Sequence, residues 1–446
     1  MALSSSPLLP SICVNGIFTS TSNYCMFGKW SPKSCASSFK LRGLSTATST
    51  TAIKAVQNED SPGPWLMLPP EYEDGKFCRA IPGMHKLGRR SYKFYSLLDN
   101  KVQTPCFDEV IRDLPLTCRG SSHGWLALLG PCNEGFFLYN PITRRHIMLP
   151  SIFNLPKLPL DDFRSSSSPT NWRDVRKLIL TCSPDEDEEN CRAVMINGFG
   201  NMLAICCPGK SKEWTMMMDE ERGNRYYNDC VYSTSRKLLY GLTNGSGLET
   251  WDLGDPSSPK LTKVDECTNY TKSEAFFWWS CLGREFLVIA GEDLLLVVQY
   301  IADVGPDGSY FDSSDELPRP DIVRHMTIGF DIFKHDPEKG RFEFVDSSSS
   351  LGGLAIFIGQ HHDAVAIPAT RFPELKPDSI YFTDGYWKGP LDGYDKDDDN
   401  DERFDDGRDI GIFNYRDKTV SEYYYPWDIV KDKVTTPIWF FPSSTI

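Results

Sequence analysis

The hydrophobic pattern is clearest between Thr327 and Phe344, where apolar and polar side chains alternate. An alternation with a period of two is typical of a β-strand with one buried face. It stops at His335–Gly340, which holds the turn-forming residues Asp, Pro and Gly. The apolar run Leu354–Ile358 follows without alternation, as in a strand buried on both faces. The stretch therefore predicts an outer hairpin followed by an inner strand.

Short apolar segments of the same kind recur along the chain after residue 90, separated by polar and turn-forming residues. We predict strands at Tyr92–Leu97, Gly120–Leu129, Phe136–Pro141, His146–Pro150, Val175–Cys182, Cys191–Ile196, Met202–Cys207, Trp214–Met218, Cys230–Tyr232, Lys237–Leu242, Glu249–Leu253, Lys260–Val264, Phe276–Ser280, Phe286–Ala290, Leu294–Ile301, Ser379–Thr383, Asp409–Tyr415, Thr419–Pro426 and Pro437–Phe441. Long helical patterns are missing from the sequence, which argues against an α/β fold.

The hairpin turns repeat. Each lies between an aromatic strand and a second strand, at Asn140-Pro141, Asp255-Pro256, Asp336-Pro337 and Arg416-Asp417. Asp255 and Asp336 are 81 positions apart, and so are Asp336 and Asp417. We interpret this spacing as two periods of about 40 residues, the length of one four-stranded propeller blade. The sequence thus predicts an all-β, kelch-like β-propeller of about six to eight blades over residues 62–446.

A propeller is stable when its first and last blades meet, because the unpaired backbone groups of an open sheet edge are prone to pair with other chains. The apolar segments Pro437–Phe441 and Pro64–Leu68 have no hairpin partner nearby in the sequence. We expect at least one of them to dock onto blades from the other end of the chain, burying Trp439 or Trp65.

Charge separates the first 58 residues from the rest. They carry five basic and no acidic residues, whereas the 446-residue chain has a formal net charge of −14, so the remainder holds −19. An acidic surface repels phosphate backbones, and no apolar run approaches the length of a membrane span. We expect neither a nucleic-acid partner nor a membrane span.

Residues 1–58 are rich in Ser and Thr and contain some Lys and Arg. This composition is typical of a disordered organellar transit peptide. Abundant Ser favours a chloroplast, but Arg42–Ser45 also suits a mitochondrial processing site, so the organelle stays open. An ordinary disordered tail is the alternative, with a location in the cytosol or nucleus.

The chain has 14 cysteines and no Cys-x-x-Cys motif, and three of the cysteines lie in the first 58 residues. A chain of this size does not need a disulfide framework. We therefore expect the cysteines to be small buried hydrophobes in a reducing compartment.

Two polar stretches are candidate sites. His361-His362-Asp363 is the only adjacent His pair, but it lacks further ligands, so we expect a surface loop, with a metal or catalytic site as alternatives.

Asp392–Asp409 holds ten acids. Its alternating acids resemble an EF-hand loop, yet Asn400 stands where Gly is needed and Asp406 replaces the bidentate Glu. A solvated loop is expected there, with weak divalent-cation binding as the alternative.

Other polar features point to structural roles. We expect the acidic run Asp185–Glu189 to be a solvated turn, and His123 to be a hydrogen-bonding residue at a blade edge rather than a general base. Leu351-Gly-Gly-Leu354 enters a strand rather than a helix, unlike a phosphate-binding loop. We assign no catalytic, cofactor-binding or metal-ligating residue from the sequence and expect no enzyme.

Several motifs occur together in a fixed order, and they lie at Pro64–Pro70, Phe94–Leu97, Gly120–Leu126, Tyr139–Pro141, Leu149–Pro150, Leu351–Gly359, Ser379–Asp384 and Asp409–Phe413. In these stretches the chain resembles, from about residue 62 to its end, the plant family called domain of unknown function 295. Its members are also described as KIB-type β-propellers.

The resemblance implies a propeller. Many members of the family carry a helical F-box and look like substrate receptors of ubiquitin ligases, but the Pro- and Gly-broken segment 61–88 cannot supply an F-box. The chain is similar to the branch that lacks the F-box and has an organellar leader. The function we expect is a non-enzymatic module that binds a protein partner, of unknown identity, in an organelle. The alternative is a ubiquitin-ligase receptor, by family analogy.

Overall fold

The computed structural model describes residues 63–69, 71–72, 90–104, 116–130, 135–152, 155, 175–197, 201–218, 225–245, 247–266, 281–305, 310–311, 324–348, 350–359, 361–383, 409–422 and 437–442. The chain divides into two units, Met1–Asn58 and Glu59–Ile446, and all the described residues belong to the second. The predicted transit peptide, most of the segment 61–88, the predicted strand Phe276–Ser280 and the acidic tract up to Arg408 lie outside them.

Strands in the described residues form six blades, numbered here in chain order. Blade 1 has β1 (Trp65–Met67), β4 (Phe94–Ser96), β5 (Lys101–Gln103) and β28 (Ile438–Phe440), and blade 2 has β6 (Thr117–Ser122), β7 (Trp125–Leu129), β8 (Phe136–Tyr139) and β9 (His146–Met148). Blade 3 has β10 (Val175–Leu180), β11 (Ala193–Asn197), β12 (Leu203–Cys206) and β13 (Thr215–Met216), and blade 4 has β14 (Tyr227–Ser233), β15 (Leu238–Thr243), β16 (Leu248–Asp252) and β17 (Lys260–Asp265).

The last two blades are joined in one sheet, because β18 pairs in parallel with β24 at a single position. Blade 5 has β18 (Cys281–Ala290), β19 (Asp293–Val304), β21 (Arg324–Asp336) and β22 (Arg341–Phe344). Blade 6 has β23 (Leu354–Ile358), β24 (Val365–Pro368), β25 (Ser379–Phe382), β26 (Gly411–Asn414) and β27 (Thr419–Glu422). Among the described residues, four short elements accompany the blades: β2 (Glu71–Tyr72) pairs with β3 (Arg90–Ser91), β20 (Tyr310–Phe311) pairs with β19, and a 3-10 helix spans Ala369–Arg371.

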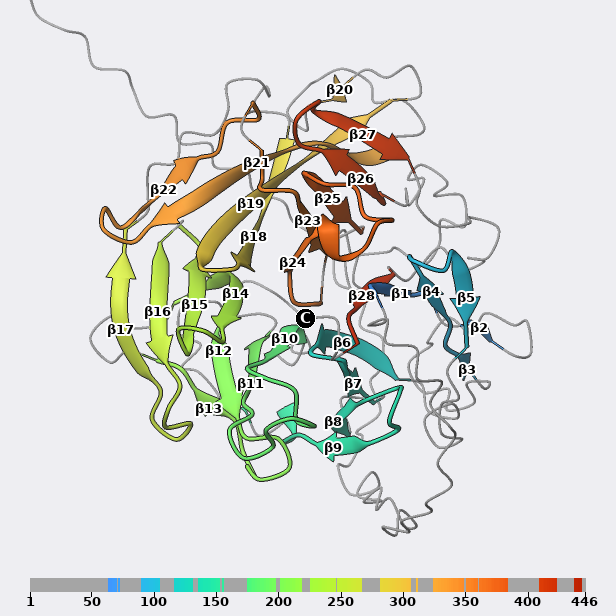
Figure 1. Cartoon of the computed structure of the whole chain (residues 1–446). Coiled ribbons are helices and arrows are strands. Elements are labelled where there is room, and N and C mark those ends of the chain that lie inside the picture. Colours follow the sequence, from blue (N-terminus) through green and yellow to red (C-terminus); the bar gives the residue numbers. More distant parts are fainter. Residues whose placement is uncertain are drawn as a thin grey trace, which may run out of the picture. The chain divides into compact units, whose positions relative to one another are not determined.

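The blades follow one another in a ring. Strand β6 lies beside β10, β10 beside β14, and β14 beside β18, while β28 lies beside β6. In Figure 1 these strands surround the centre of the unit, and β9, β13, β17 and β22 lie farther out. The fold is therefore the predicted β-propeller, and its six described blades fall within the expected number.

Each inner strand is buried on both faces because a blade packs against two neighbours. In β10, Leu178 and Leu180 enter the core shared with blade 2, whereas Ile179 enters the core shared with blade 4. In β23, Phe357 faces the core shared with blade 1 and Ile356 faces the core shared with blade 5. The uninterrupted apolar runs in the sequence correspond to this two-sided packing.

The chain closes the ring with its last strand. β28 pairs with β1 in antiparallel register, with Trp65 opposite Phe440 and Leu66 opposite Trp439. Trp439 is fully buried, at 0% exposure, and its ring meets Phe357 of blade 6 edge-on at a centroid distance of 4.9 Å. The predicted docking of the C-terminal apolar segment onto the start of the chain is thus confirmed.

The outer hairpins share a turn in which an Asn or Asp side chain accepts backbone N–H groups. Oδ1 of Asn140 accepts bonds from Ile142 and Thr143, and Asp336 and Asn414 cap their turns in the same way. This geometry explains why the turn motif recurs in the sequence.

The spacing of these turns was misread. Asp255, Asp336 and Asp417 lie in blades 4, 5 and 6, so 81 positions correspond to one blade rather than two. Strands β18, β19 and β21 are 10 to 13 residues long, and further chain separates β19 from β21 and β25 from β26. These additions lengthen the late blades.

Among the described residues, we find no helix with the length and apolar character needed to cross a membrane.

Candidate functional site

The segment that joins β23 to β24 crosses the interior of the ring, and we call Gly359 and His361–Asp363 the axial plug. The N–H of Ser121 donates to the carbonyl of His361 at 3.1 Å, and the N–H of Asp363 donates to the carbonyl of Ser121 at 3.0 Å. The plug belongs to blade 6 and Ser121 to blade 2. Blade 1 separates these two blades along the ring, so the contact spans the inside.

The expectation of a surface loop at these residues was wrong. His362 is 1% exposed, and Nδ1 of His361 lies 2.6 Å from the carbonyl oxygen of Arg176 in blade 3. Three consecutive polar residues normally indicate exposure, but here backbone groups of two other blades pair with the segment. His361 has a φ of 66°, a left-handed conformation that is uncommon for a residue other than glycine.

Asp363 links the plug to two blades through one hydroxyl. Oγ of Ser122 donates to Oδ2 of Asp363 at 2.7 Å and accepts the N–H of Leu180 at 3.1 Å. Burial raises the pKa of the Asp363 carboxyl to about 6, against the opposing effect of the Lys177 charge and the Ser122 hydrogen bond. Ser122 thus joins blades 2, 3 and 6.

A buried ion pair extends the polar network to blades 4 and 5. Nζ of Lys177 lies 2.6 Å from Oδ1 of Asp229 and donates to the carbonyl of Cys230 at 3.0 Å. The other carboxylate oxygen of Asp229 accepts the N–H of Leu287 at 2.8 Å. Burial, the largest single effect, lowers the pKa of Lys177, but the interactions with Asp229, Cys230 and Asp363 together outweigh it and the net shift is upward. We call Ser122, Lys177, Asp229 and the axial plug together the axial cluster.

Both plug histidines are neutral near pH 7. Burial lowers the pKa of His361 to about 3 and that of His362 to about 4, and neighbouring cationic groups act in the same direction. Nδ1 of His362 therefore donates to the carbonyl of Asp363, at 2.6 Å.

Gly359 fits closely between two polar side chains. A Cβ at this position would lie 2.1 Å from Oγ1 of Thr383 and 2.5 Å from Nε2 of His362. Neither of those atoms has a hydrogen-bond partner among the described residues. Only glycine fits here without displacing its neighbours.

The chemistry of the axial cluster is that of a connector. The hydroxyl of Ser122 is hydrogen-bonded to the carboxylate of Asp363 rather than to an imidazole, so the pair does not form a Ser-His arrangement. Within the described ranges, no group of three or more His, Cys, Asp and Glu side chains is placed to hold a metal ion. The polar atoms instead join blades that are distant in the sequence.

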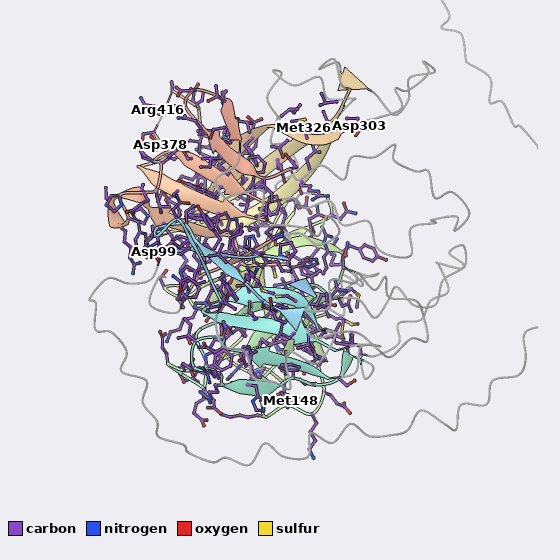
Figure 2. All side chains as sticks on the ribbon, turned by 90° about the vertical axis from the view of Figure 1, so that its right-hand side faces the viewer. Asp99, Met148, Asp303, Met326, Asp378 and Arg416 are labelled. Atoms are coloured by element: carbon purple, nitrogen blue, oxygen red, sulfur yellow. The ribbon has the colours of Figure 1, made fainter. Side chains whose placement is uncertain are left out.

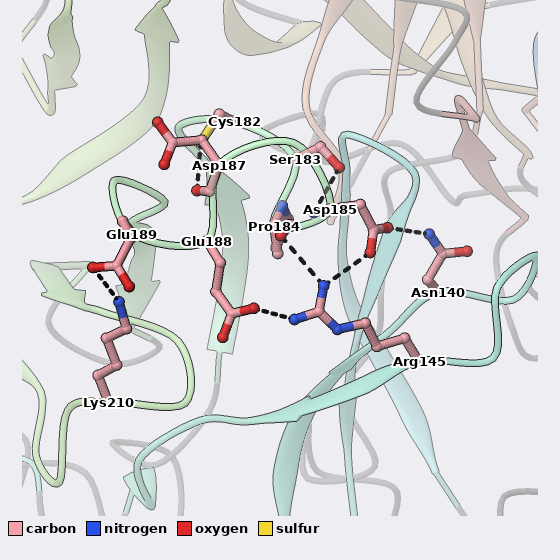
Figure 3. A network of polar contacts seen from close by, with 10 residues as sticks. All are labelled: Asn140, Arg145, Cys182, Ser183, Pro184, Asp185, Asp187, Glu188, Glu189 and Lys210. Carbon is pink, nitrogen blue, oxygen red and sulfur yellow. Dashed lines mark hydrogen bonds and ion pairs between the residues drawn. The ribbon is translucent and has the colours of Figure 1, made fainter. Parts of the chain in front are cut away.

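A second, exposed network joins blades 2 and 3 (Figure 3). Arg145 donates to Asp185 at 3.0 Å and is paired with Glu188, while Nδ2 of Asn140 donates to the second oxygen of Asp185 at 2.9 Å. Lys210 pairs with Glu189 at 3.0 Å. The acidic run is exposed, as predicted. Its residues Asp185 and Glu188 also hold Arg145 of blade 2, and we call these three residues together with Asn140 the Arg145 clamp. Each exposed pair contributes at most about 1 kcal/mol.

The other predicted positions have structural surroundings. His123 and Gly124 have φ values of 50° and 76° and form the two-residue turn between β6 and β7. Gly353 precedes β23, as predicted, and its N–H donates to Asp378 at 3.0 Å. Of the acidic tract only Asp409 is described; it accepts a hydrogen bond from Thr327, and burial raises its pKa to about 6.

Lys177 and Asp229 escaped the sequence analysis. Each is a buried charged residue inside a strand, but each follows a half-buried polar residue, Arg176 in β10 and Asn228 in β14. A buried charge requires a partner, but a pair of polar residues in the sequence indicates exposure, so the sequence held no clear signal for this ion pair.

A family model for the KIB1-4 β-propeller matches residues 94–414, most of the described part of the chain. The chain belongs to this family. A search of curated proteins finds no match. The matched region contains blades 2 to 5 and the axial plug of blade 6, whereas strands β1, β27 and β28 lie outside it.

Solved structures provide more distant likenesses. The chain is similar to AztD from Citrobacter koseri, with 13% identity and a TM-score of 0.29 over 63% of this chain and 56% of AztD. It is also similar to the Malassezia sympodialis allergen Mala s 1, with 8% identity and a TM-score of 0.31 over 79% of this chain and 86% of the allergen. A third likeness is to YCF48 bound to D1 peptide, with 11% identity and a TM-score of 0.25, over 57% of this chain and 74% of YCF48. The chain thus spans little more than half the length of the AztD chain that it matches.

Proposed function

We propose that this KIB1-4 β-propeller is a non-enzymatic module that binds a protein partner inside a plant organelle. In this proposal it belongs to the branch of the domain of unknown function 295 family that lacks an F-box. The propeller fold suits such a role, because a rigid ring of blades holds many loops and edge strands in fixed positions.

The observation that carries the proposal is the use of the axial cluster. Ser122 and Asp229 direct their polar atoms to backbone or side-chain partners in other blades. Nζ of Lys177 likewise donates to the carboxylate of Asp229 and to the carbonyl of Cys230, both in blade 4. These groups are occupied in holding the ring, so recognition falls to the outer surface.

Large apolar side chains lie exposed on that surface. They are at least 36% exposed and come from blades 2 to 6 or the chain beside them: Ile142, Met148, Met218, Tyr226, Met326, Phe344 and Val420. Met148 and Met326 lie at the periphery of the described side chains in Figure 2. Exposed apolar groups on a rigid scaffold are suitable anchors for a protein partner.

The organellar location rests on the sequence. The first 58 residues are basic and rich in Ser and Thr, and the remainder is strongly acidic. The alternative, a ubiquitin-ligase receptor in the cytosol or nucleus, rests on analogy with family members that carry an F-box.

Photo-crosslinking in plant cells tests the proposal. A photoreactive residue is placed at Met148, Met218, Phe344 or Val420 in a fluorescent fusion of the whole chain, and at buried Trp251 as the control. We expect an organellar signal and one protein crosslinked from positions on neighbouring blades, with none from Trp251. A cytosolic signal with a crosslinked Skp-type adaptor would favour the alternative. Equal yields of many proteins from every position would contradict a specific binding module.

A further inference from the structure

Two cysteines face each other where the hairpin of β10 and β11 opens into the acidic run. The ladder pairs Leu180 with Ala193. It continues for one more step, since the N–H of Thr181 donates to the carbonyl of Arg192 at 3.0 Å. Cys182 and Cys191 are therefore the next pair across the hairpin.

The two side chains lie on the same face. Cys191 belongs to the core that blades 2 and 3 share, and Cys182 packs against that core, as Leu180 and Ala193 do two pairs earlier in the hairpin. Sγ of Cys191 lies 3.3 Å from the carbonyl oxygen of Cys182. Thr181 and Arg192 occupy a hydrogen-bonded position, because the N–H of Thr181 donates to the carbonyl of Arg192, while the N–H of Arg192 donates to Oγ1 of Thr181. The cysteines therefore occupy the next, non-hydrogen-bonded position. Such pairs have Cα atoms about 4.5 Å apart, within the range of about 4.4–6.8 Å for a disulfide.

The two thiols differ in access and acidity. Cys182 is half-buried, whereas Cys191 is 1% exposed. A hydrogen bond from Cys191 lowers the pKa of the Cys182 thiol, and the same interaction together with burial raises the pKa of Cys191. By contrast, burial raises the pKa of Cys118 to about 11. Cys182 is thus suited to attack first and Cys191 to follow.

We propose that Cys182 and Cys191 form a redox-reactive dithiol whose oxidation closes a disulfide at the base of the loop 183–190. The oxidant is a disulfide, either glutathione disulfide or the disulfide of a thioredoxin-like protein. The thiolate of Cys182 attacks one sulfur of the oxidant, forming a mixed disulfide and releasing the first thiolate. Cys191 then loses its proton and attacks Sγ of Cys182, which releases the second thiolate. The pair loses two electrons and two protons, and the oxidant becomes two thiols.

The modification would act on the contact between blades 2 and 3. The loop that it closes carries Asp185 and Glu188, which hold Arg145 of blade 2. In Figure 3, Cys182 lies at the end of this loop, and its thiol donates a hydrogen bond to the carbonyl oxygen of Asp187. A disulfide fixes both ends of the loop and so holds the Arg145 clamp in place. Reduction releases that constraint without moving either blade.

Peptide mapping of the purified full-length chain tests the proposal. The protein is equilibrated in glutathione buffers from fully reduced to fully oxidised, its free thiols are alkylated, and it is digested with trypsin. One tryptic peptide, Leu178–Arg192, contains both cysteines and no other. We expect this peptide to carry two alkyl groups in reducing buffer. In oxidising buffer it should carry none and be lighter than the unalkylated dithiol by two hydrogen atoms.

Variants and a protease provide the controls. In Cys191→Ser we expect Cys182 to keep a bound glutathione, whereas Cys207→Ser should leave closure unchanged. Oxidation should also slow cleavage of the native protein by a glutamate-specific protease at Glu186–Glu189. Two alkyl groups in every buffer, glutathione retained on Cys182 of the unaltered chain, or a disulfide from Cys182 to another cysteine would each overturn the proposal. The mapping needs only the unaltered chain, so a variant that fails to fold does not affect the test.

Discussion

Nζ of Lys177 lies 2.6 Å from Oδ1 of Asp229, and the two side chains are only 9% and 4% exposed. The pair joins blade 3 to blade 4, and Asp229 extends the link to blade 5 through Leu287. Removing one partner leaves the other charge buried and unpaired, which is much less favourable than the loss of an exposed pair.

We expect Asp229→Ala to lower the free energy of unfolding by about 3–5 kcal/mol. Urea unfolding followed by tryptophan fluorescence measures the change. The double variant Lys177→Met, Asp229→Leu should recover much of the loss, because it leaves neither member of the ion pair as an unpaired buried charge. As the matched control, Asp293→Ala removes the half-exposed partner of Lys334 and should change stability little. Equal effects of Asp229→Ala and Asp293→Ala would show that the buried pair does not hold the blades.

The close fit of Gly359 gives a second prediction. A methyl group at this position collides with Thr383 and His362, so Gly359→Ala should destabilise the fold by about 1–3 kcal/mol. Adding Thr383→Ala should restore part of that loss, and Thr383→Ala alone serves as the control. Thermal unfolding of the three variants makes the comparison. A Gly359→Ala protein as stable as the parent would mean that the plug is not packed as described.

The axial cluster also predicts a pH dependence. Burial lowers the pKa of His362 from 6.5 to about 4, so between these pH values the unfolded chain binds a proton that the folded chain excludes. This part of the stability is present above pH 6.5 and is lost as the pH falls towards 4. From pH 7 to pH 5 the loss amounts to about 2 kcal/mol for this residue.

His362→Asn keeps a donor for the carbonyl of Asp363 and removes the titration. We therefore expect the variant to lose less stability than the parent between pH 7 and pH 5, measured by urea unfolding at both values. Asp363 acts in the opposite direction, because its pKa is raised to about 6 and the folded state gains a proton below that value. An identical pH dependence in parent and variant would contradict a neutral, buried His362.

Ring closure gives the fourth prediction. Trp439 packs between β1 and blade 6, so Trp439→Ala should cost about 3–5 kcal/mol and promote aggregation. Phe344→Ala, at a 46% exposed aromatic residue of the edge strand β22, should change stability by about 0.5 kcal/mol or less. Calorimetry of both variants tests the contrast. A Trp439→Ala protein that melts like the parent would mean that the ring does not depend on β28.

Local patterns predicted most of the described strands but missed β5 and β24. The run Leu354–Ile358 indicated two-sided burial, and the structure gives it two cores. The C-terminal segment was apolar without a local partner, which correctly predicted closure by β28. The blade spacing failed because the long strands β18, β19 and β21 lengthen blade 5 and the long connection between β25 and β26 lengthens blade 6, so the distance between turns resembles two repeats.

The axial plug could not be predicted from local pattern. Ser122 and Asp363 are 241 positions apart, and their contact depends on how blades 2 and 6 are placed in the ring. His361-His362-Asp363 is polar, and in a single sequence polarity indicates exposure. Only the folded chain shows that backbone groups from two other blades satisfy the segment.

We infer that the axial cluster holds the ring and propose that the outer surface binds the partner. The most direct test is the crosslinking yield to the partner from an outer-surface position in cells, compared between the parent and His362→Asn. We expect equal yields, since the variant alters the axial plug and leaves every exposed side chain in place. A folded His362→Asn protein that no longer reaches the partner would contradict binding by the outer surface and place recognition in the axial cluster.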